Sequence, residues 1–394
     1  MPELISLEEA RARVLGAVAP LGAERVALAA CLGRFLGEDV VAGEDLPPFD
    51  ASAMDGYAVV AGEGAELPVV GESRAGAPAS GALEAGQAMR ISTGAVMPAG
   101  ADAVVPVERV TERGEIVVVP AVEAGANVRS AGEDMRAGER VLAAGAPIGP
   151  AELAVLASVG QPEPLCGRRP RVAVLATGDE LVEPGAALAP GQIRNSNAFA
   201  LAAQAERAGA EVVLRERVPD AARATRDALR GALEGADVVC VSGGVSVGPH
   251  DHVKPALAEL GVEQRFWGVR LKPGKPTWFG SGSGSLVFGL PGNPVSAMVT
   301  FHLFARPALI ALAGGDPAAE RTPAILDTAI KRSKGRDHVV RCRLTVAADG
   351  LHVEPTKAQN SHVLSSMLGA SAFGYVPAGD GELVAGDRID VELL

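Results

Sequence analysis

A glycine-rich segment in the middle of the chain carries the strongest sign of ligand binding. The run Val238 to Asp251, VVCVSGGVSVGPHD, places β-branched residues before three glycines and ends on a carboxylate. The valines favour a buried strand, and the glycines let backbone N–H groups approach an anion without a Cβ in the way. No GxxxxGK[ST] or GxGxxG pattern occurs, so neither an ATPase nor a nicotinamide enzyme is indicated. The segment predicts an anion-binding loop; the alternative is a tight turn with no ligand.

A second segment, KPGKP, combines two lysines with a stiff backbone. Lys272 and Lys275 stand in five residues that also hold two prolines and a glycine. Prolines restrict the backbone, and ammonium groups held in place suit an oxyanion. Solvated loop lysines are the alternative.

Carboxylates follow other predicted strands. Glu180 follows the first strand, Asp220 the second and Asp251 the third, while Asn293 follows the last. Mg²⁺ prefers hard oxygen ligands and needs only one or two carboxylates when phosphate oxygens complete its shell. We therefore expect a nucleotide-like or phosphorylated ligand with Mg²⁺. Asp220 and Asn293 have the alternative role of helix N-caps.

The elements that must position these residues alternate between strand and helix over residues 171 to 313. The strand-like runs are RVAVLA, VVLRERV, VVCVS, RFWGVR and LVFGL, and helical patterns separate most of them. This rhythm predicts a doubly wound, mostly parallel sheet with helices on both faces. Ligands of such sheets bind at the carboxyl ends of the strands, so we expect all these segments on one rim. The apolar stretch Val295 to Ala313 predicts a core helix, because charged residues and a proline interrupt it.

Composition and charge exclude several classes of protein. A chain of 394 residues exceeds what one core usually serves, which predicts two to four domains. A formal charge of −12 argues against nucleic-acid or anionic-membrane partners. The four cysteines form no CxxC pair and the N-terminal residues are acidic, which favours a cytoplasmic protein without a signal peptide.

Seven motifs in chain order resemble the molybdopterin molybdenumtransferases, the MoeA family that includes the E domain of gephyrin. They are DASAMDGYA, RISTGAVMP, NVRSAGEDM, ATGDEL, SGGVSVGPHD, KPGKP and GLPGNPVS. The resemblance implies an enzyme that inserts molybdate into adenylylated molybdopterin with Mg²⁺ and releases AMP and molybdenum cofactor. It also implies a homodimer whose site is shared between subunits.

The implied architecture is multidomain, α/β plus β. It comprises a doubly wound α/β molybdopterin-binding domain, an elongated β domain, a small connecting domain and a C-terminal β-barrel. We predict an N-terminal helix in 1–20 that packs on the α/β domain, a connecting and dimerisation domain in 21–45 and 137–168, the elongated β domain in 46–136, the α/β domain in 169–317 and the barrel in 318–394.

Family roles carried over by motif give the predicted site. The catalytic residues are Asp251, Glu180, Asp55, Asp134, Lys272 and Lys275, with Asp251 and Glu180 as Mg²⁺ ligands. The substrate-binding residues are Thr93, Thr177, Asp220, Ser242, Gly243, Gly244, Ser246, Gly248, Pro276, Pro291, Asn293, Pro294, Ser296, Arg270, Arg341 and Ser361. Those of the β domain, Asp55, Thr93 and Asp134, are implied to complete the site of the partner subunit.

One position departs from the family pattern. Many members carry a lysine where this chain has Gly268. Because strand alternation would put positions 268 and 270 on the same side, we expect Arg270 to supply the missing charge.

Two alternatives stand beside this interpretation. A molybdopterin adenylyltransferase shares the α/β sheet but is a single short domain, so the β module and the barrel count against it. A gephyrin-like, non-enzymatic scaffold would bind a receptor peptide, and no linker-rich extension supports it. The expected transient partners are an adenylyltransferase and the molybdoenzymes or their chaperones.

Overall fold

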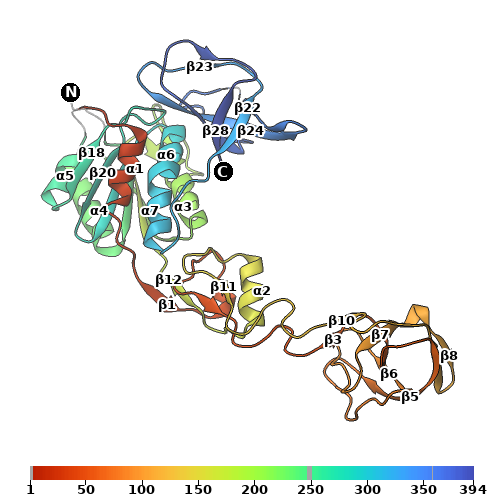
Figure 1. Cartoon of the computed structure of the whole chain (residues 1–394). Coiled ribbons are helices and arrows are strands. Elements are labelled where there is room, and N and C mark those ends of the chain that lie inside the picture. Colours follow the sequence, from red (N-terminus) through yellow and green to blue (C-terminus); the bar gives the residue numbers. More distant parts are fainter. Residues whose placement is uncertain (1–2, 246–250, 357) are drawn as a thin grey trace.

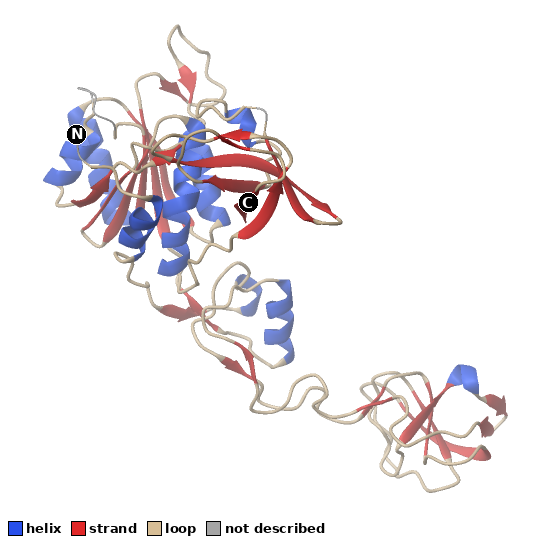
Figure 2. Ribbon diagram, turned by 45° about the horizontal axis from the view of Figure 1, so that its top comes forward, coloured by secondary structure: helices blue, strands red, loops and turns tan. Residues whose placement is uncertain are grey.

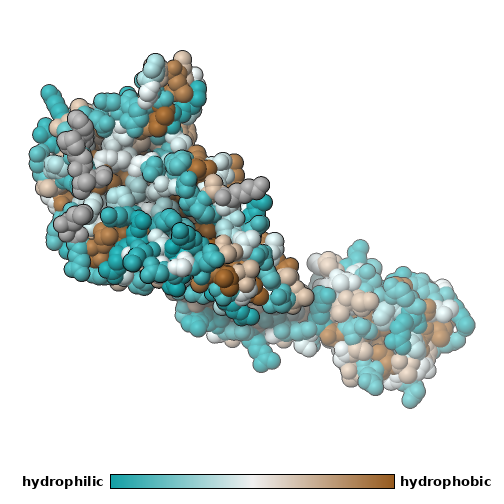
Figure 3. Space-filling model, turned by 90° about the horizontal axis from the view of Figure 1, so that it is seen from above, coloured by the Kyte–Doolittle hydropathy of each residue, from teal (hydrophilic) through white to brown (hydrophobic). Residues whose placement is uncertain are grey.

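The chain folds into an elongated arrangement of four bodies. The computed structural model describes residues 3–245, 251–356 and 358–394. The α/β domain and the C-terminal barrel adjoin at one end, the β domain lies at the other, and a small connecting body stands between them (Figure 1). Seen from above, the β domain is a separate lobe joined through a narrower region (Figure 3).

The α/β domain is built on a six-stranded sheet in the order β16-β13-β17-β21-β20-β18. The first four strands are parallel, and β20 is antiparallel to both of its neighbours. The strand β18 therefore points the same way as the parallel ones, and their carboxyl ends meet at one edge. This confirms the doubly wound, mostly parallel sheet; β20 was not predicted. The bounds are β13 Arg171–Thr177, β16 Glu211–Val218, β17 Val238–Ser242, β18 Glu263–Trp267, β20 Trp278–Gly282 and β21 Ser285–Leu290.

Helices cover both faces of this sheet (Figure 2). Alternate residues of β13 and β17 face opposite ways and create two cores, one beneath α3 and the run from α6 to α7, the other beneath α4 and α5. The N-terminal α1 packs in the first core through Leu7, Ala10 and Val14. The bounds are α1 Leu7–Leu15, α3 Asn197–Arg207, α4 Ala222–Gly235, α5 Val253–Glu259, α6 Pro294–Thr300, the π-helical η3 Phe301–Ala305 and α7 Arg306–Leu312.

The helical run from α6 to α7 is the apolar stretch that we expected in the core. Its 19 residues, Pro294–Leu312, are long and apolar enough to cross a membrane, but 78% of the apolar window is buried inside the protein. The run therefore has the surroundings of a core helix in a soluble protein.

The C-terminal region is a closed five-stranded barrel. Its strands pair in the ring β24-β25-β22-β28-β26, which the pairing of β26 with β24 closes. A short strand of the α/β domain, β19 (Leu271–Lys272), adds in parallel to β24 and sets Lys272 opposite His338. The two domains therefore share a sheet edge at the KPGKP segment. The bounds are β22 Thr322–Leu326, β24 Asp337–Ala347, β25 Gly350–Pro355, β26 Ala372–Val376 and β28 Arg388–Leu393.

The remaining two bodies are smaller. The β domain holds a six-stranded sheet in the order β7-β4-β6-β5-β9-β8, over a core of valines, alanines and Tyr57. The connecting body packs α2 (Pro150–Ser158) against the two-stranded pairs β1–β12 and β2–β11. Its strands are β1 Ala23–Arg25, β2 Val40–Val41, β11 Arg140–Leu142 and β12 Leu165–Gly167; those of the β domain are β4 Gly56–Val59, β5 Ala65–Ser73, β6 Ala88–Ile91, β7 Ala103–Pro106, β8 Thr111–Arg113 and β9 Ile116–Val119.

Candidate active site

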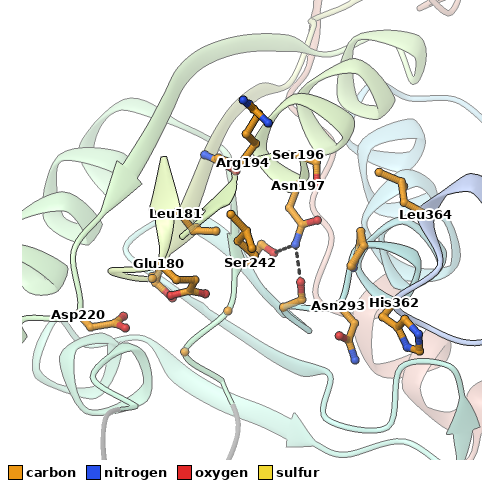
Figure 4. A pocket seen from close by; sticks show the side chains of 18 of the residues that line it. Glu180, Leu181, Arg194, Ser196, Asn197, Asp220, Ser242, Asn293, His362 and Leu364 are labelled. Carbon is orange, nitrogen blue, oxygen red and sulfur yellow. Dashed lines mark hydrogen bonds between the residues drawn. The ribbon is translucent and has the colours of Figure 1, made fainter. Parts of the chain in front are cut away.

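The carboxyl edge of the parallel strands borders a cavity of about 600 Å³, which we call the acidic cavity (Figure 4). Segments that follow β13, β16, β17 and β21 all contribute to its wall, as strand order predicts. The residues predicted from sequence that line it are Thr177, Glu180, Asp220, Ser242, Gly243, Gly244, Asp251, Asn293 and Pro294. Ser246 and Gly248, the remaining predicted residues of the glycine loop, lie outside the described residues.

Two glycines of the loop are required by the backbone and by close approach. Gly243 and Gly244 have φ of +91° and +62°. A Cβ on them would lie 2.8 Å and 3.0 Å from the Thr177 hydroxyl oxygen. Only glycine combines this conformation with this distance. The Thr177 hydroxyl is buried against these two glycines and has no hydrogen-bond partner among the described residues.

Asn197, at the start of α3, was not among the predicted site residues, and it ties the loops after β17 and β21 together. Its Nδ2 donates to Ser242 Oγ at 2.8 Å and to the Gly292 carbonyl at 2.7 Å (Figure 4). Ser242 Oγ in turn donates to the Pro291 carbonyl at 3.4 Å. The feature of the sequence that could have identified Asn197 is its side-chain amide in the first turn of a predicted helix.

Three carboxylates give the acidic cavity its character. The Asp251 side chain is only 7% exposed and lies 3.4 Å from Lys254 Nζ. Burial raises the pKa of Asp251, against the opposing effect of Lys254. A carboxylate so perturbed in a cavity is a candidate functional group. The carboxylates of Glu180 and Asp220 line the same cavity.

The alternative role of Asp220, that of a helix N-cap, is wrong. The helix α4 has Ala221 at its N-cap, and no side chain caps it. The Asp220 backbone N–H donates to Asp179 Oδ1 at 3.1 Å, and Asp220 lines the acidic cavity.

The carboxylates of the acidic cavity could provide some, but not all, of the ligands of a Mg²⁺ ion. Within residues 3–245, 251–356 and 358–394, no three His, Cys, Asp or Glu side chains converge as a complete metal cage. Mg²⁺ keeps water and phosphate ligands and takes one or two carboxylates from the protein. The separated carboxylates of the acidic cavity match that second arrangement.

A second cavity of about 420 Å³ adjoins the first, and we call it the basic cavity. Only Asn293 and His362 appear in the described lining of both. Its cations are Lys272, Lys275 and Arg336, and none pairs with a carboxylate in the described part of the chain. The predicted residues that line it are Lys272, Lys275, Pro276, Pro291, Asn293, Ser296 and Ser361.

A loop of the C-terminal domain closes the basic cavity. Ser361 accepts the Val295 N–H on its carbonyl at 3.1 Å, and its hydroxyl accepts from Asn293 Nδ2 at 3.1 Å. Asn293 is the positional N-cap of α6, but its side chain makes no capping bond. It holds the second domain in place instead.

Arg341 stands behind this loop and does not line either cavity. Its side chain is fully buried, and Nη2 donates to the carbonyls of Ala358 and Asn360 at 3.0 Å and 3.4 Å. Burial lowers its pKa to about 10. The resemblance implied that Arg341 faces the cleft; the structure places it where it shapes the loop that carries Ser361.

Arg270 is also directed away from the cavities. Its Nη1 donates to the Leu4 carbonyl at 2.7 Å. The strand β18 ends at Trp267, and Gly268 has φ of +88°, so the alternation on which the expectation for Arg270 depended does not extend that far. Arg336, from the C-terminal domain, is the additional cation of the basic cavity.

The predicted residues of the β domain do not reach either cavity within one chain. Asp55 Oδ1 accepts the Thr93 backbone N–H at 2.7 Å, so these two lie together. Asp134 lies in the segment that returns to the connecting body, and its N–H donates to the Leu46 carbonyl at 3.0 Å. All three are exposed, and their domain is at the opposite end of the molecule from the α/β domain (Figure 1).

Comparison with known proteins decides the family. Three family models match in order: "MoeA N-terminal region (domain I and II)" over residues 5–160, "Probable molybdopterin binding domain" over 173–311 and "MoeA C-terminal region (domain IV)" over 323–394. The molybdopterin molybdenumtransferase of Haemophilus influenzae is 37% identical over 99% of this chain and 98% of its own length. The chain belongs to the MoeA family.

Other MoeA-family proteins agree in sequence and in fold. The molybdopterin molybdenumtransferase of Staphylococcus aureus is 32% identical over 99% of this chain and 95% of its own. A MoeA protein of Pyrococcus horikoshii with 30% identity superposes with a TM-score of 0.80 and covers 99% of both chains. The fold class is thereby confirmed, and as a MoeA-family protein this chain is a molybdenumtransferase of molybdenum cofactor biosynthesis.

Proposed function

We propose that this MoeA-family transferase takes adenylylated molybdopterin, inserts molybdate into its dithiolene with the help of Mg²⁺, and releases AMP and molybdenum cofactor. The observation that carries the proposal is the pair of adjoining cavities of opposite charge. One suits phosphate groups with Mg²⁺, and the other suits a small dianion.

The acidic cavity is the proposed site of the phosphate groups of the substrate. The positive φ at Gly243 and Gly244 and the absence of Cβ atoms let the loop pack closely on Thr177, and the backbone of this loop lines the cavity wall where a phosphate would bind. Asp251 and Glu180 would hold Mg²⁺ beside these phosphates, with Asp220 at the same wall. When bound, Mg²⁺ stabilises negative charge on phosphate oxygens.

The basic cavity is the proposed site of molybdate. Lys272 and Lys275 lie on a loop that an internal contact stiffens, because Thr277 Oγ1 donates to the Gly274 carbonyl at 2.7 Å. Arg336 adds a third cation from the other domain, and Ser296 and Ser361 supply hydroxyl groups. Since the cavities adjoin, molybdate would stand beside the group that receives it, which lowers the entropic cost of the reaction.

A homodimer would complete the site. Asp55, Thr93 and Asp134 are exposed and far from the cavities of their own chain, which is the placement expected of residues that act on a partner subunit. We further propose that the enzyme works in the cytoplasm, receives its substrate from an adenylyltransferase and passes the cofactor to molybdoenzymes or their chaperones.

The test is turnover of the proposed substrate. Purified protein would be incubated with adenylylated molybdopterin, Mg²⁺ and molybdate, and AMP release measured. We expect release that requires both molybdate and Mg²⁺. A folded protein that releases no AMP, or releases it equally without molybdate, would contradict the proposed function.

A further inference from the structure

His362 occupies the boundary between the two cavities. Apart from Asn293, it is the only described residue in the lining of both. Its side chain lies close to that of Asn293 at the cavity wall (Figure 4). A group in this position can reach a ligand in either cavity.

The position of His362 is held from both domains. The preceding Ser361 bonds to Asn293 and to the Val295 N–H of the α/β domain. On the barrel side, Gln359 Oε1 accepts the Arg341 backbone N–H at 3.1 Å, and its Nε2 donates to the Arg341 carbonyl at 2.9 Å. The hydrogen bonds of Gln359 and Ser361 therefore restrain the backbone just before His362.

His362 also differs in chemistry from every other ionisable group in the two described linings. Histidine is the side chain that exchanges a proton near neutral pH, whereas lysine and arginine hold their protons firmly. Transfer of molybdate to sulfur requires the metal to lose an oxygen, which leaves readily only after protonation. The facing charged groups are Lys272, Lys275 and Arg336 in the basic cavity, and Glu180, Arg194, Asp220 and Asp251 in the acidic one.

We propose that His362 is the general acid that protonates the oxygen lost by molybdate. The inference rests on the proposed function. As two Mo–S bonds form to the dithiol, one Mo–O bond breaks and the oxygen leaves as water. The imidazolium gives this oxygen a proton and recovers one from a thiol, while the other thiol supplies the second proton. Molybdenum stays at the +6 state, so no oxidant or reductant is needed.

The test compares His362→Gln with His352→Gln, a matched change of a histidine that lines neither cavity. General acid catalysis contributes about a hundredfold or more, so His362→Gln should lower cofactor formation by at least that factor. Binding of radiolabelled molybdate should change by less than about threefold, because the cations remain.

Two results would overturn the inference. Cofactor formation by His362→Gln within threefold of the unmodified rate would show that His362 is not the proton donor. A loss of molybdate affinity in proportion to the lost rate would assign His362 to binding alone. If one of these results is found while the unmodified protein converts adenylylated molybdopterin, only the inference about His362 fails. If the unmodified protein does not convert this substrate, the proposed function fails as well.

Discussion

The acidic and the basic cavity are neighbours, yet their charged groups are kept apart. Elsewhere on the described surface several arginine side chains pair with a carboxylate, as Arg90 does with Glu112 at 2.8 Å and Arg113 with Glu66 at 2.9 Å. In the basic cavity, by contrast, Lys272, Lys275 and Arg336 have no such partner among the described residues. Opposite charges brought into contact would neutralise one another, so their separation leaves the three cations of the basic cavity available to a ligand, whereas Asp251 in the acidic cavity already lies 3.4 Å from Lys254 Nζ.

The two cavities also differ in how they are built. The acidic cavity is formed largely by the strand ends of one sheet, whereas the basic cavity needs a loop and Arg336 from the barrel. The addition of β19 to β24 joins the two contributors. A change in one cavity should therefore leave the ligand of the other cavity largely undisturbed.

The largest expected effect separates the cavities directly. Asp251→Asn removes a buried charge but keeps the volume, and loss of Mg²⁺ stabilisation should lower AMP release about a thousandfold. Molybdate binding should stay within about twofold, because Asp251 does not line the basic cavity. Lys275→Ala is the matched change and should weaken molybdate binding instead. Equal loss of both properties in Asp251→Asn would show that the cavities act as one.

A mixing experiment tests whether the comparison extends to a second subunit. Asp55→Ala and Asp251→Asn should each be inactive as purified dimers. After the two are unfolded and refolded together, about a quarter of normal AMP release should return, because half of random dimers are mixed and each has one intact site. Asp251→Asn mixed with Lys275→Ala is the control, and mixing should give no more AMP release than the average of the two purified variants, because both changes lie in the same domain and no intact site can form. Failure to recover activity would mean that the site is not shared.

A smaller effect distinguishes the two arginines near the basic cavity. Arg336→Ala removes a charged hydrogen-bond donor and should weaken molybdate binding about tenfold or more. Arg270→Ala should change it by less than about twofold, since the Arg270 guanidinium bonds to Leu4. Equilibrium binding of radiolabelled molybdate measures both. The opposite order would restore Arg270 as the replacement for the lysine absent at Gly268.

The smallest effect belongs to a histidine that lines neither cavity. His352 contacts Asp327 at 2.7 Å and Asp349 at 2.9 Å, and these carboxylates raise its pKa, Asp327 foremost. Because the pKa of His352 is higher in the folded than in the unfolded protein, the protonated imidazole stabilises the fold at a pH below the pKa of the unfolded state. This stabilisation is lost as the pH rises through the pKa of the folded state. His352→Gln should thus melt slightly below the unmodified protein in acid but not in alkali, with unchanged AMP release. A melting difference that grew with pH would contradict this account.

Much of the acidic cavity could be predicted because it depends on strand order. Thr177, Glu180, Asp220, Ser242 and Asp251 each follow a recognisable strand, and parallel strands place such residues on one edge. Gly243 and Gly244 could be expected to adopt positive φ because glycine has no Cβ. Local pattern was sufficient wherever the sheet itself determined the distances.

The basic cavity was only half predictable. Lys272 and Lys275 could be recognised as site residues because prolines restrict the loop around them. Arg336 and His362 lie in segments of the C-terminal domain that contain no such motif. Arg270 was misassigned because the strand ends one residue before Gly268. The alternative N-cap role of Asp220 was wrong because α4 begins one residue later than its pattern indicated.

The sequence by itself determined the family, the sheet and the residues at its carboxyl edge, since all of these follow from short-range pattern and strand direction. Only the tertiary structure decided that the barrel supplies Arg336 and His362, that Arg341 supports a loop, and that the β domain lies far from the cavities of its own chain. These are contacts between segments distant in sequence, and no local periodicity encodes which of them meet.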